Sequence, residues 1–253
     1  MNTMVLNENQ LRYYAPSIYG TPSEKLSDRY TFVPTYEVLN ILKHEGFVPV
    51  RAGQTGKGLH AKHMVRLRHR DYIHMPVEID TKIPEAVLFN SHDGTTKFSV
   101  ASGIFIVVCA NGMVVGEKVN KQSIKHLGSA EEVANLVFET AKDVPRVFNA
   151  IEEMSAIELT PNEKGVFAKA AHALRWKENE GAAPDALIVP RRYADNKNDL
   201  WTTTSVVQEN IMKGGYLGAR KKVRGIKSVV EDMRLNRSLW ILAEEFKQLK
   251  EAA

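Results

Sequence analysis

Cysteine is almost missing from this chain. Only Cys109 occurs among 253 residues, so no disulfide can form within the chain. Long apolar runs are missing too, because GIFIVVCA (103–110) is far shorter than the about 20 residues of a membrane helix. The start, MNTMVLNENQ, has neither the basic nor the apolar region of a signal peptide. We therefore expect a cytoplasmic protein with no membrane partner.

The common motifs of nucleotide-binding and metal-dependent enzymes are also lacking. The sequence has no G-x-x-x-x-G-K-[ST], no G-x-G-x-x-G, no H-E-x-x-H and no C-x-x-C. The segment GQTGKG (53–58) has a Gly-Lys pair, but no Ser or Thr follows the lysine. His60, His63 and His69 lie among cations, which disfavours a metal ion. We expect no cofactor and no metal, and we favour a non-enzymatic role over an enzymatic one.

Basic residues, in contrast, are locally concentrated. The net charge is only +4, but residues 210–237 hold eight Lys and Arg against two acids. Residues 43–70 hold seven against one. Two such excesses indicate an anionic partner, most often a nucleic acid. The alternative is a solvated surface on a mildly basic protein.

Hydrophobic periodicity predicts an α+β fold in which antiparallel hairpins pack against helices. The expected strands are 47–52, 63–71, 85–89, 96–109 and 113–119, with a hairpin turn at Asn111-Gly112. The expected helices are 35–46, 129–144, 160–174, 200–215 and 226–250.

Composition also suggests how the chain is divided. Residues 1–33 are expected to form an arm with little regular structure. The segment ENEGAAPDA (178–186) is rich in breakers and is the best linker candidate. The prediction is an α+β core domain at 1–178 and a helical, basic C-terminal region at 187–253, which could pack on the same domain.

The segment NSHDGT (90–95) places the three side chains of a hydrolase triad in a row. Triad members come from separate parts of a chain, and neighbouring side chains on a strand point to opposite faces. Asp93-Gly94 between two apolar runs is instead typical of a hairpin turn. We interpret the segment as a turn, and we keep Asn90 and His92 as candidate contacts of a polar loop.

Three arginines alternate along the predicted strand 63–71. Arg66, Arg68 and Arg70 should share the face opposite to Val65 and Leu67. Alternate residues lie about 6.6 Å apart, a spacing that suits the phosphates of an extended single strand. The row predicts a solvent-facing track for a nucleic-acid backbone. The alternative is an edge strand protected by charge.

Other side chains extend this predicted nucleic-acid interface. Beside the arginine row lie Lys62 and Lys97. A second contact region is expected at Lys213, Arg220, Lys221, Lys222 and Arg224. Tyrosines near basic residues, on which bases could stack, are Tyr13, Tyr14, Tyr72 and Tyr216.

Four blocks of the sequence resemble one known family. They are RYTFVPTYEVLNILKHEGFVPVRAGQT (29–55), LFNSHDGTTKFSVASGIFIVVCANGM (88–113), LWTTTSVVQENIMKGG (200–215) and LNRSLWILAEEF (235–246). These blocks are similar to the phage- and plasmid-borne family of unknown function numbered 932, which implies a mobile genetic element in a bacterial host. The order of elements also resembles, more distantly, that of single-strand annealing proteins, which commonly form rings or filaments.

We therefore expect a single-stranded DNA-binding protein of a phage or plasmid, located in the host cytoplasm. It would promote strand annealing or recombination without nucleotide hydrolysis, and it would form a homo-oligomer. DNA is favoured over RNA. Two alternatives stay open: an interaction protein that inhibits a host defence or nuclease system, and a metal-dependent nucleic-acid enzyme that uses the acids around Asp80.

Overall fold

The chain divides into two compact units. In this computed structural model, unit 1 comprises Met1–Val144 and Ser228–Val230, and unit 2 comprises Pro145–Lys227 and Glu231–Ala253. The predicted linker, 178–186, lies inside unit 2. The structure describes residues 5–26, 30–74, 81–96, 98–106, 111–115, 132, 135, 144–217 and 222–252.

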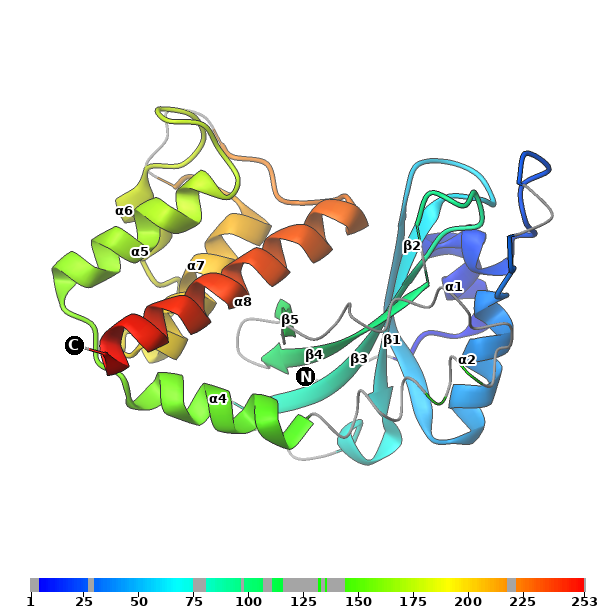
Figure 1. Cartoon of the computed structure of the whole chain (residues 1–253), viewed down its shortest axis with the longest axis horizontal. Helices are drawn as coiled ribbons and strands as arrows, with labels where there is room; N and C mark the ends of the chain where they lie inside the picture. The colour runs from blue at the N-terminus through cyan, green and yellow to red at the C-terminus, as the bar shows by residue number, and fades with distance from the viewer. Residues whose placement is uncertain are drawn as a thin grey trace. The chain divides into compact units, whose positions relative to one another are not determined.

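Unit 1 contains one antiparallel sheet whose strands are adjacent in chain order (Figure 1). The strands are β1 (Phe47–Thr55), β2 (Lys62–His69), β3 (Lys82–Asn90), β4 (Ser99–Ile106) and β5 (Asn111–Val115). Each predicted strand corresponds to one of these. The turn predicted at Asn111-Gly112 is wrong, because both residues belong to β5 and Asn111 pairs with Ile106 of β4.

The segment before the sheet is more regular than predicted. It contains α1 (Glu8–Tyr14), η1 (Pro16–Tyr19) and α2 (Thr35–His44). A capping box starts α1, because the Asn7 side chain accepts from the Gln10 N–H at 3.0 Å and the Gln10 side chain accepts from the Asn7 N–H at 2.9 Å. The expectation of an arm with little regular structure is therefore wrong for residues 8–19.

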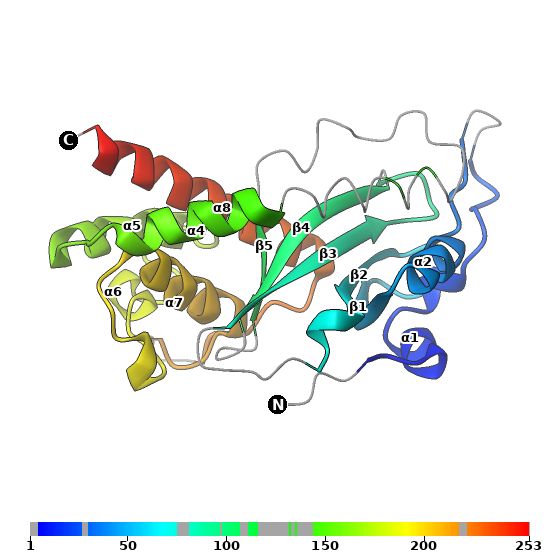
Figure 2. The ribbon, with the colours of Figure 1, turned by 90° about the horizontal axis from the view of Figure 1, so that it is seen from below.

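These short helices cover one face of the sheet, as Figure 2 shows for α1 and α2 beside β1 and β2. Alternation along the strands sends every second side chain to this face. The core between the helices and the sheet consists of Leu11, Ile18, Val38, Leu39, Leu42, Val65, Leu67, Ala86, Leu88, Phe98 and Val100. The opposite face of β2 therefore carries Met64, Arg66 and Arg68.

Unit 2 is helical, so the chain as a whole has the predicted α+β class. Its helices are α4 (Val144–Ala156), α5 (Pro161–Ala173), α6 (Pro184–Leu187), η4 (Tyr193–Asp195), α7 (Leu200–Lys213) and most of α8 (Val229–Glu251). A capping box of Thr160 and Glu163 starts α5, which was predicted at 160–174. The helix α7, predicted at 200–215, ends at Lys213, before Gly214. The predicted helix 129–144 lies largely outside the described residues.

Buried polar side chains link the helices α7 and α8. Gln208 donates to Asn236 at 2.8 Å, and Asn236 donates to the Asp232 carboxylate at 2.8 Å. Apolar contacts add to this, because Phe167 of α5 lies edge-on to Phe246 of α8 with ring centroids 5.5 Å apart. Within the described part of the chain, no helix has both the length and the apolar character needed to cross a membrane.

Candidate nucleic-acid interface

The predicted arginine row does not face solvent. Arg66 and Arg68 are each only 1% exposed. Both donate to Glu85 of β3, itself 5% exposed: Arg66 Nη1 lies 2.9 Å from Oε2, and Arg68 Nη2 lies 2.8 Å from Oε1. One carboxylate thus bridges two buried guanidinium groups. The predicted exposure of these two arginines is wrong, because this face of β2 is buried as well as the face that carries Val65 and Leu67.

The neighbours of these two arginines are placed differently. Arg70 lies beyond the end of β2, in the short helix η2 (Arg70–Tyr72), and it is exposed. Its Nη2 donates to the Lys43 carbonyl at 3.2 Å. Lys62, at the start of β2, is partly exposed. Lys97 lies outside the described residues. No continuous row of exposed arginines therefore runs along β2.

The NSHDGT segment forms the predicted turn between β3 and β4. Ser91 Oγ donates to Asp93 Oδ1 at 2.7 Å, and the Thr95 N–H and hydroxyl donate to the same oxygen at 2.9 and 2.7 Å. Burial opposes ionisation of Asp93, but the hydrogen bonds from Ser91 and Thr95 outweigh it and hold the pKa of Asp93 below its usual value. The Ser91 hydroxyl therefore stabilises the turn, and it makes no hydrogen bond to His92 of the kind that a nucleophile makes to its base.

The backbone of this turn requires glycine at one position. Gly94 has φ +73°, and a Cβ there would come within 2.5 Å of a Leu26 methyl. We expect Gly94→Ala to lower the free energy of unfolding by about 1 to 2 kcal/mol, as left-handed backbone costs a residue with a Cβ. Urea unfolding would measure this.

Gly165→Ala is the matched control for that change. Gly165 lies inside α5, and a Cβ there would meet nothing within 4 Å. The same substitution should therefore raise stability, by up to about 1 kcal/mol, because alanine favours helix. Equal stability of Gly94→Ala and the unaltered protein would contradict the proposed role of the turn.

Asn90 and His92 belong to a buried polar cluster that joins the turn to the sheet and the short helices. Its centre is His63 of β2, whose Nε2 lies 2.8 Å from Thr35 Oγ1 and whose Nδ1 lies 3.0 Å from the Ala61 carbonyl. Asn90 Nδ2 donates to the same Thr35 hydroxyl at 3.0 Å. Because a carbonyl can only accept, Nδ1 carries the proton and Nε2 accepts from Thr35.

The charge state of this cluster follows from its burial. Burial lowers the pKa of His63 to about 4, against the opposing effect of the Ala61 carbonyl. Burial also lowers the pKa of His92 to about 4, and the two rings lie with centroids 5.0 Å apart. Ser17, whose Oγ lies 3.0 Å from His63 Nδ1, completes the cluster. Neutral and enclosed, these side chains are not placed to bind a polyanion.

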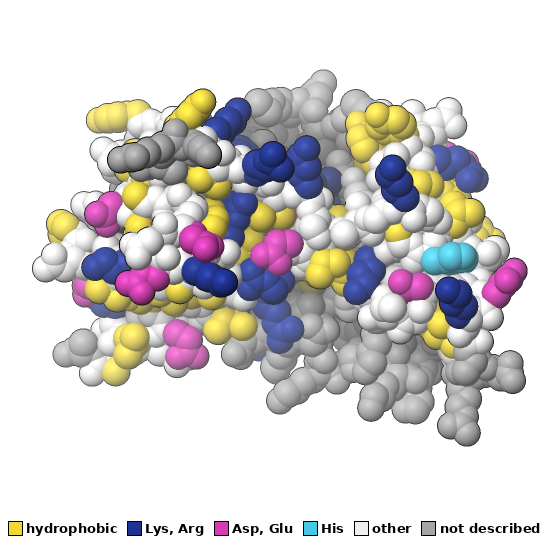
Figure 3. All heavy atoms as spheres, turned by 90° about the horizontal axis from the view of Figure 1, so that it is seen from above, with side chains coloured by type: hydrophobic (Ala, Val, Ile, Leu, Met, Phe, Trp, Pro, Cys, Tyr) yellow, Lys and Arg dark blue, Asp and Glu magenta, His cyan; other side chains and the backbone are white. Residues whose placement is uncertain are grey.

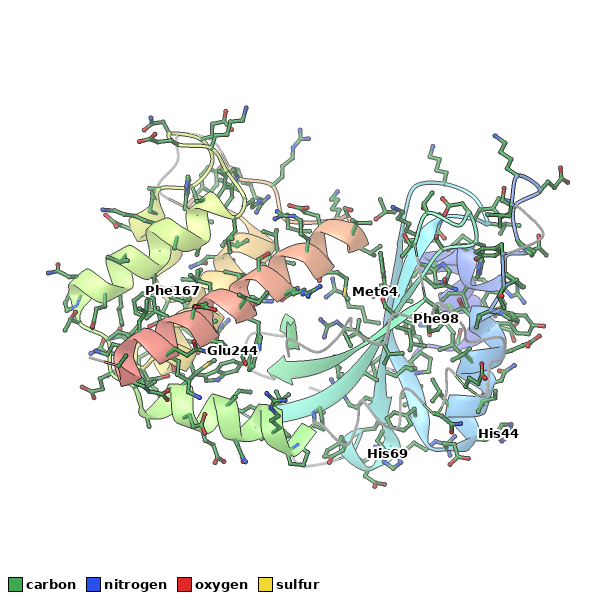
Figure 4. All side chains as sticks on the ribbon, in the orientation of Figure 1. His44, Met64, His69, Phe98, Phe167 and Glu244 are labelled. Carbon is green, nitrogen blue, oxygen red and sulfur yellow. The ribbon has the colours of Figure 1, made fainter. Side chains whose placement is uncertain are left out.

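The histidines of residues 43–70 do not gather into a metal site. Figure 4 shows His44 at the end of α2 and His69 at the end of β2. His60 Nδ1 lies 2.8 Å from the Thr21 carbonyl, and His69 Nδ1 lies 3.1 Å from the Asp71 carboxylate. Across the described residues, no three His, Cys, Asp or Glu side chains are placed to hold a metal ion.

The second predicted region contains exposed basic residues. Lys222 and Arg224 are exposed, whereas Lys213 Nζ lies 2.8 Å from the buried Glu209 carboxylate. Arg220 and Lys221 lie outside the described residues. On the face drawn in Figure 3, Lys and Arg side chains are interspersed with Asp and Glu. Lys222 and Arg224, which follow α7, are therefore accessible members of the predicted interface, as is Arg70.

A backbone bridge closes the loop after α7. Gly215 and Val223 form an antiparallel bridge with hydrogen bonds of 2.9 and 2.8 Å. We call Gly214–Tyr216 with Lys222–Arg224 the clasp. Residues that flank such a bridge lie opposite each other, so Tyr216, which is 77% exposed, lies opposite Lys222. The clasp thus presents an aromatic ring beside cations.

Two arginines anchor the clasp to the end of α7. Arg175 donates to the carbonyls of Ile211 and Arg224. Arg191 donates to the Asn210 side chain at 2.7 Å and to the Gly214 carbonyl. Cations are favourable at a helix C-terminus, where carbonyl groups lack partners within the helix. The backbone that carries Tyr216 and Arg224 is therefore held in a defined position.

Comparison of the chain with known proteins identifies its family. The model of the family described as "Domain of unknown function (DUF932)" matches residues 23–240. The chain belongs to the DUF932 family. The resemblance to the family numbered 932 is thereby confirmed. The match begins before α2 and ends within α8, so in this DUF932 chain α1, η1 and the last part of α8 lie outside the matched range.

Two relatives of this DUF932 protein come from Escherichia coli (strain K12). The chain is 37% identical to the UPF0380 protein YafZ and 36% identical to the UPF0380 protein YfjQ, each over 255 residues. Each alignment covers 94% of this chain and 90% of the relative. No solved structure matches.

Proposed function

We propose that this DUF932 protein binds single-stranded DNA and promotes strand annealing or recombination without nucleotide hydrolysis. The observation that supports the proposal is the clasp, where exposed Tyr216 lies opposite Lys222, and exposed Arg224 follows on the same strand of the bridge. Single-strand binders combine cations that hold phosphates with aromatic rings on which bases stack. Arg66 and Arg68, buried with Glu85, have no part in this proposal.

The clasp suits a single strand better than a sequence-specific duplex contact. A tyrosine ring stacks on any base, and Lys222 and Arg224 can hold neighbouring phosphates without reading base edges. The binding should therefore show little base preference and a strong dependence on salt, since phosphate contacts release counterions. DNA rather than RNA, and assembly into a homo-oligomer, are parts of the same proposal.

Replacing Lys222 and Arg224 together with Gln tests the clasp. The double variant should bind a labelled single strand more weakly, and its salt slope should become shallower by up to about two phosphate equivalents. Fluorescence anisotropy across a salt series measures both quantities. The affinity of Tyr216→Ala for the strand should also fall. Tyr216→Phe keeps the ring, so its affinity should stay close to that of the unaltered protein.

The matched control replaces Lys169 and Lys177 with Gln. Both lysines are exposed in unit 2, and neither belongs to the clasp, so the net charge changes equally. Equal losses in the two double variants would show a general charge effect and contradict the clasp. A folded, unaltered protein that binds no single strand at low salt would overturn the proposal. Mass measurement with and without the strand tests assembly.

A further inference from the structure

Unit 1 contains a groove beside its short helices. It has a volume of about 740 Å³ and lies among α1, η1, α2 and β1. Leu11 and Leu39 belong to its apolar lining, and Arg12, Tyr19, Tyr36 and Lys43 supply rings and cations. Sites for small ligands commonly have volumes of about 300 to 1,000 Å³, so the groove is large enough for one or two bases.

The rings in this groove are arranged for stacking. The Tyr19 and Tyr36 rings lie nearly parallel, with an interplanar angle of 19° and centroids 6.3 Å apart. The Arg12 guanidinium lies over the Tyr19 ring, 3.8 Å from its centroid. Tyr19 is half-buried and held by this contact, whereas Tyr36 is 39% exposed. The exposed ring can therefore accept another planar group against its face.

The charges at the groove also suit an anion. Arg12 and Lys43 are exposed cations in its lining. Glu8 lies 2.7 Å from Arg12, in an ion pair whose two side chains are more than half exposed. In such an exposed pair the two charges hold each other only weakly. Arg12 can therefore donate to a phosphate while its guanidinium stays over Tyr19. Among the described lining residues the Glu8 carboxylate would oppose that phosphate, and the Glu37 carboxylate, which accepts from the Tyr36 hydroxyl at 3.0 Å, lies near the exposed ring.

We propose that this groove binds unstacked bases of single-stranded DNA, with Tyr36 as the stacking surface and Arg12 and Lys43 on the adjacent phosphates. This inference rests on the proposed function and adds a second contact, in unit 1, to the clasp of unit 2. The parallel rings and flanking cations favour a nucleic-acid strand over a peptide, whose apolar side chains would need only the leucines of the lining.

Crosslinking can locate the bases directly. The probe is a thymidine oligonucleotide with single 5-iodouracil substitutions, which crosslink under light to aromatic side chains that they contact. Mass spectrometry of the unaltered full-length protein should find crosslinks on Tyr36 or Tyr19. This readout needs no variant, so it shows whether bases contact the groove even if a substitution there prevents folding.

Affinity measurements give an independent test. Tyr36→Ala should weaken binding about 5-fold or more, as loss of one stacked base does, and Tyr36→Phe should bind almost normally. Glu8→Gln should bind more tightly than the unaltered protein, because it removes the carboxylate beside Arg12. Tyr193→Ala is the matched control, since Tyr193 lies in η4 of unit 2 and is 94% exposed; its affinity should not change.

The outcomes separate this inference from the proposed function. No binding by the unaltered protein would overturn both. The groove proposal alone would be overturned if the unaltered protein binds normally with crosslinks only on the clasp and Tyr36→Ala binds with unchanged affinity. Tight capture of an amphipathic peptide at the groove, with no crosslink there, would do the same. Crosslinks on Tyr36 together with the loss in Tyr36→Ala, but not in Tyr193→Ala, would support it.

Discussion

Replacing Glu85 with Gln should lower the free energy of unfolding by about 3 to 5 kcal/mol, the range measured when one partner of a buried ion pair is removed. The Glu85 carboxylate is the shared acceptor of Arg66 and Arg68, and all three side chains are almost fully buried. The amide keeps the shape of the carboxylate but has no charge and only one acceptor oxygen. Two buried cations then lose the anion that offsets their desolvation.

Urea unfolding followed by circular dichroism measures this loss, and Glu8→Gln is its matched control. Glu8 also pairs with an arginine in unit 1, but the Glu8 and Arg12 side chains are 65% and 53% exposed. Breaking such an exposed pair should cost less than about 1 kcal/mol. A Glu85 variant no less stable than the Glu8 variant would show that the buried bridge contributes little.

A third variant separates the charge from the packing. Replacing Arg66, Arg68 and Glu85 together with Met, Met and Leu removes every charge of the bridge at once. Replacing a complete buried ion pair with apolar residues is often neutral or stabilising. We therefore expect the triple variant to be more stable than Glu85→Gln alone, although it contains more changes.

This bridge also shows where prediction from the sequence ends. Alternation along β2 correctly placed Arg66 and Arg68 on the face opposite to Val65 and Leu67. It could not show that this second face is buried, because burial of a face depends on what packs over the sheet, and the acid that pairs with the two arginines comes from β3. In that pairing Arg66 lies opposite Val87, two residues from Glu85. A pattern confined to one strand contains no information about an acid on its neighbour.

Helices with capping or stop residues at both ends were predicted close to their observed bounds. The helix α7 was predicted at 200–215 and runs from Leu200 to Lys213, because the Asp199 side chain caps its start and Gly214, with φ +65°, ends it. The capping box of Asn7 and Gln10 was present in the sequence too, but it was not used, and α1 was missed. Local signals at the helix ends were thus sufficient for α7, whereas the local signal for a turn at Asn111-Gly112 was wrong.

The candidate sites depend on contacts that are distant in the sequence. Tyr19 and Tyr36 come together only when η1 packs beside α2, and no spacing rule joins them. The clasp was partly predictable, since Tyr216, Lys222 and Arg224 lie in the basic stretch. The polar cluster was not, because His63 meets Ser17 and Thr35 from 46 and 28 residues away.

That cluster leads to the second large effect, a loss of stability in mild acid. His63 and His92 each have a pKa of about 4 in the folded protein, against about 6.5 in an unfolded chain. Between these values the unfolded chain binds more protons, so stability falls as pH falls from about 6.5 to about 4. Above pH 6.5 these two groups add no pH dependence. Each histidine should contribute roughly 3 kcal/mol to the total loss.

Urea unfolding at steps between pH 7 and 4.5 would give the slope of stability against pH, and the variants assign it. His63→Gln with His92→Gln should flatten the slope, whatever stability the double variant retains. His44→Gln removes an exposed histidine of the same unit and should leave the slope unchanged. NMR titration of the folded protein adds a readout that needs no variant, because the ring protons of two histidines should not shift until well below pH 6. If both rings titrate near 6.5 while the protein stays folded, His63 and His92 are not held neutral by burial, and the acid sensitivity must come from other groups.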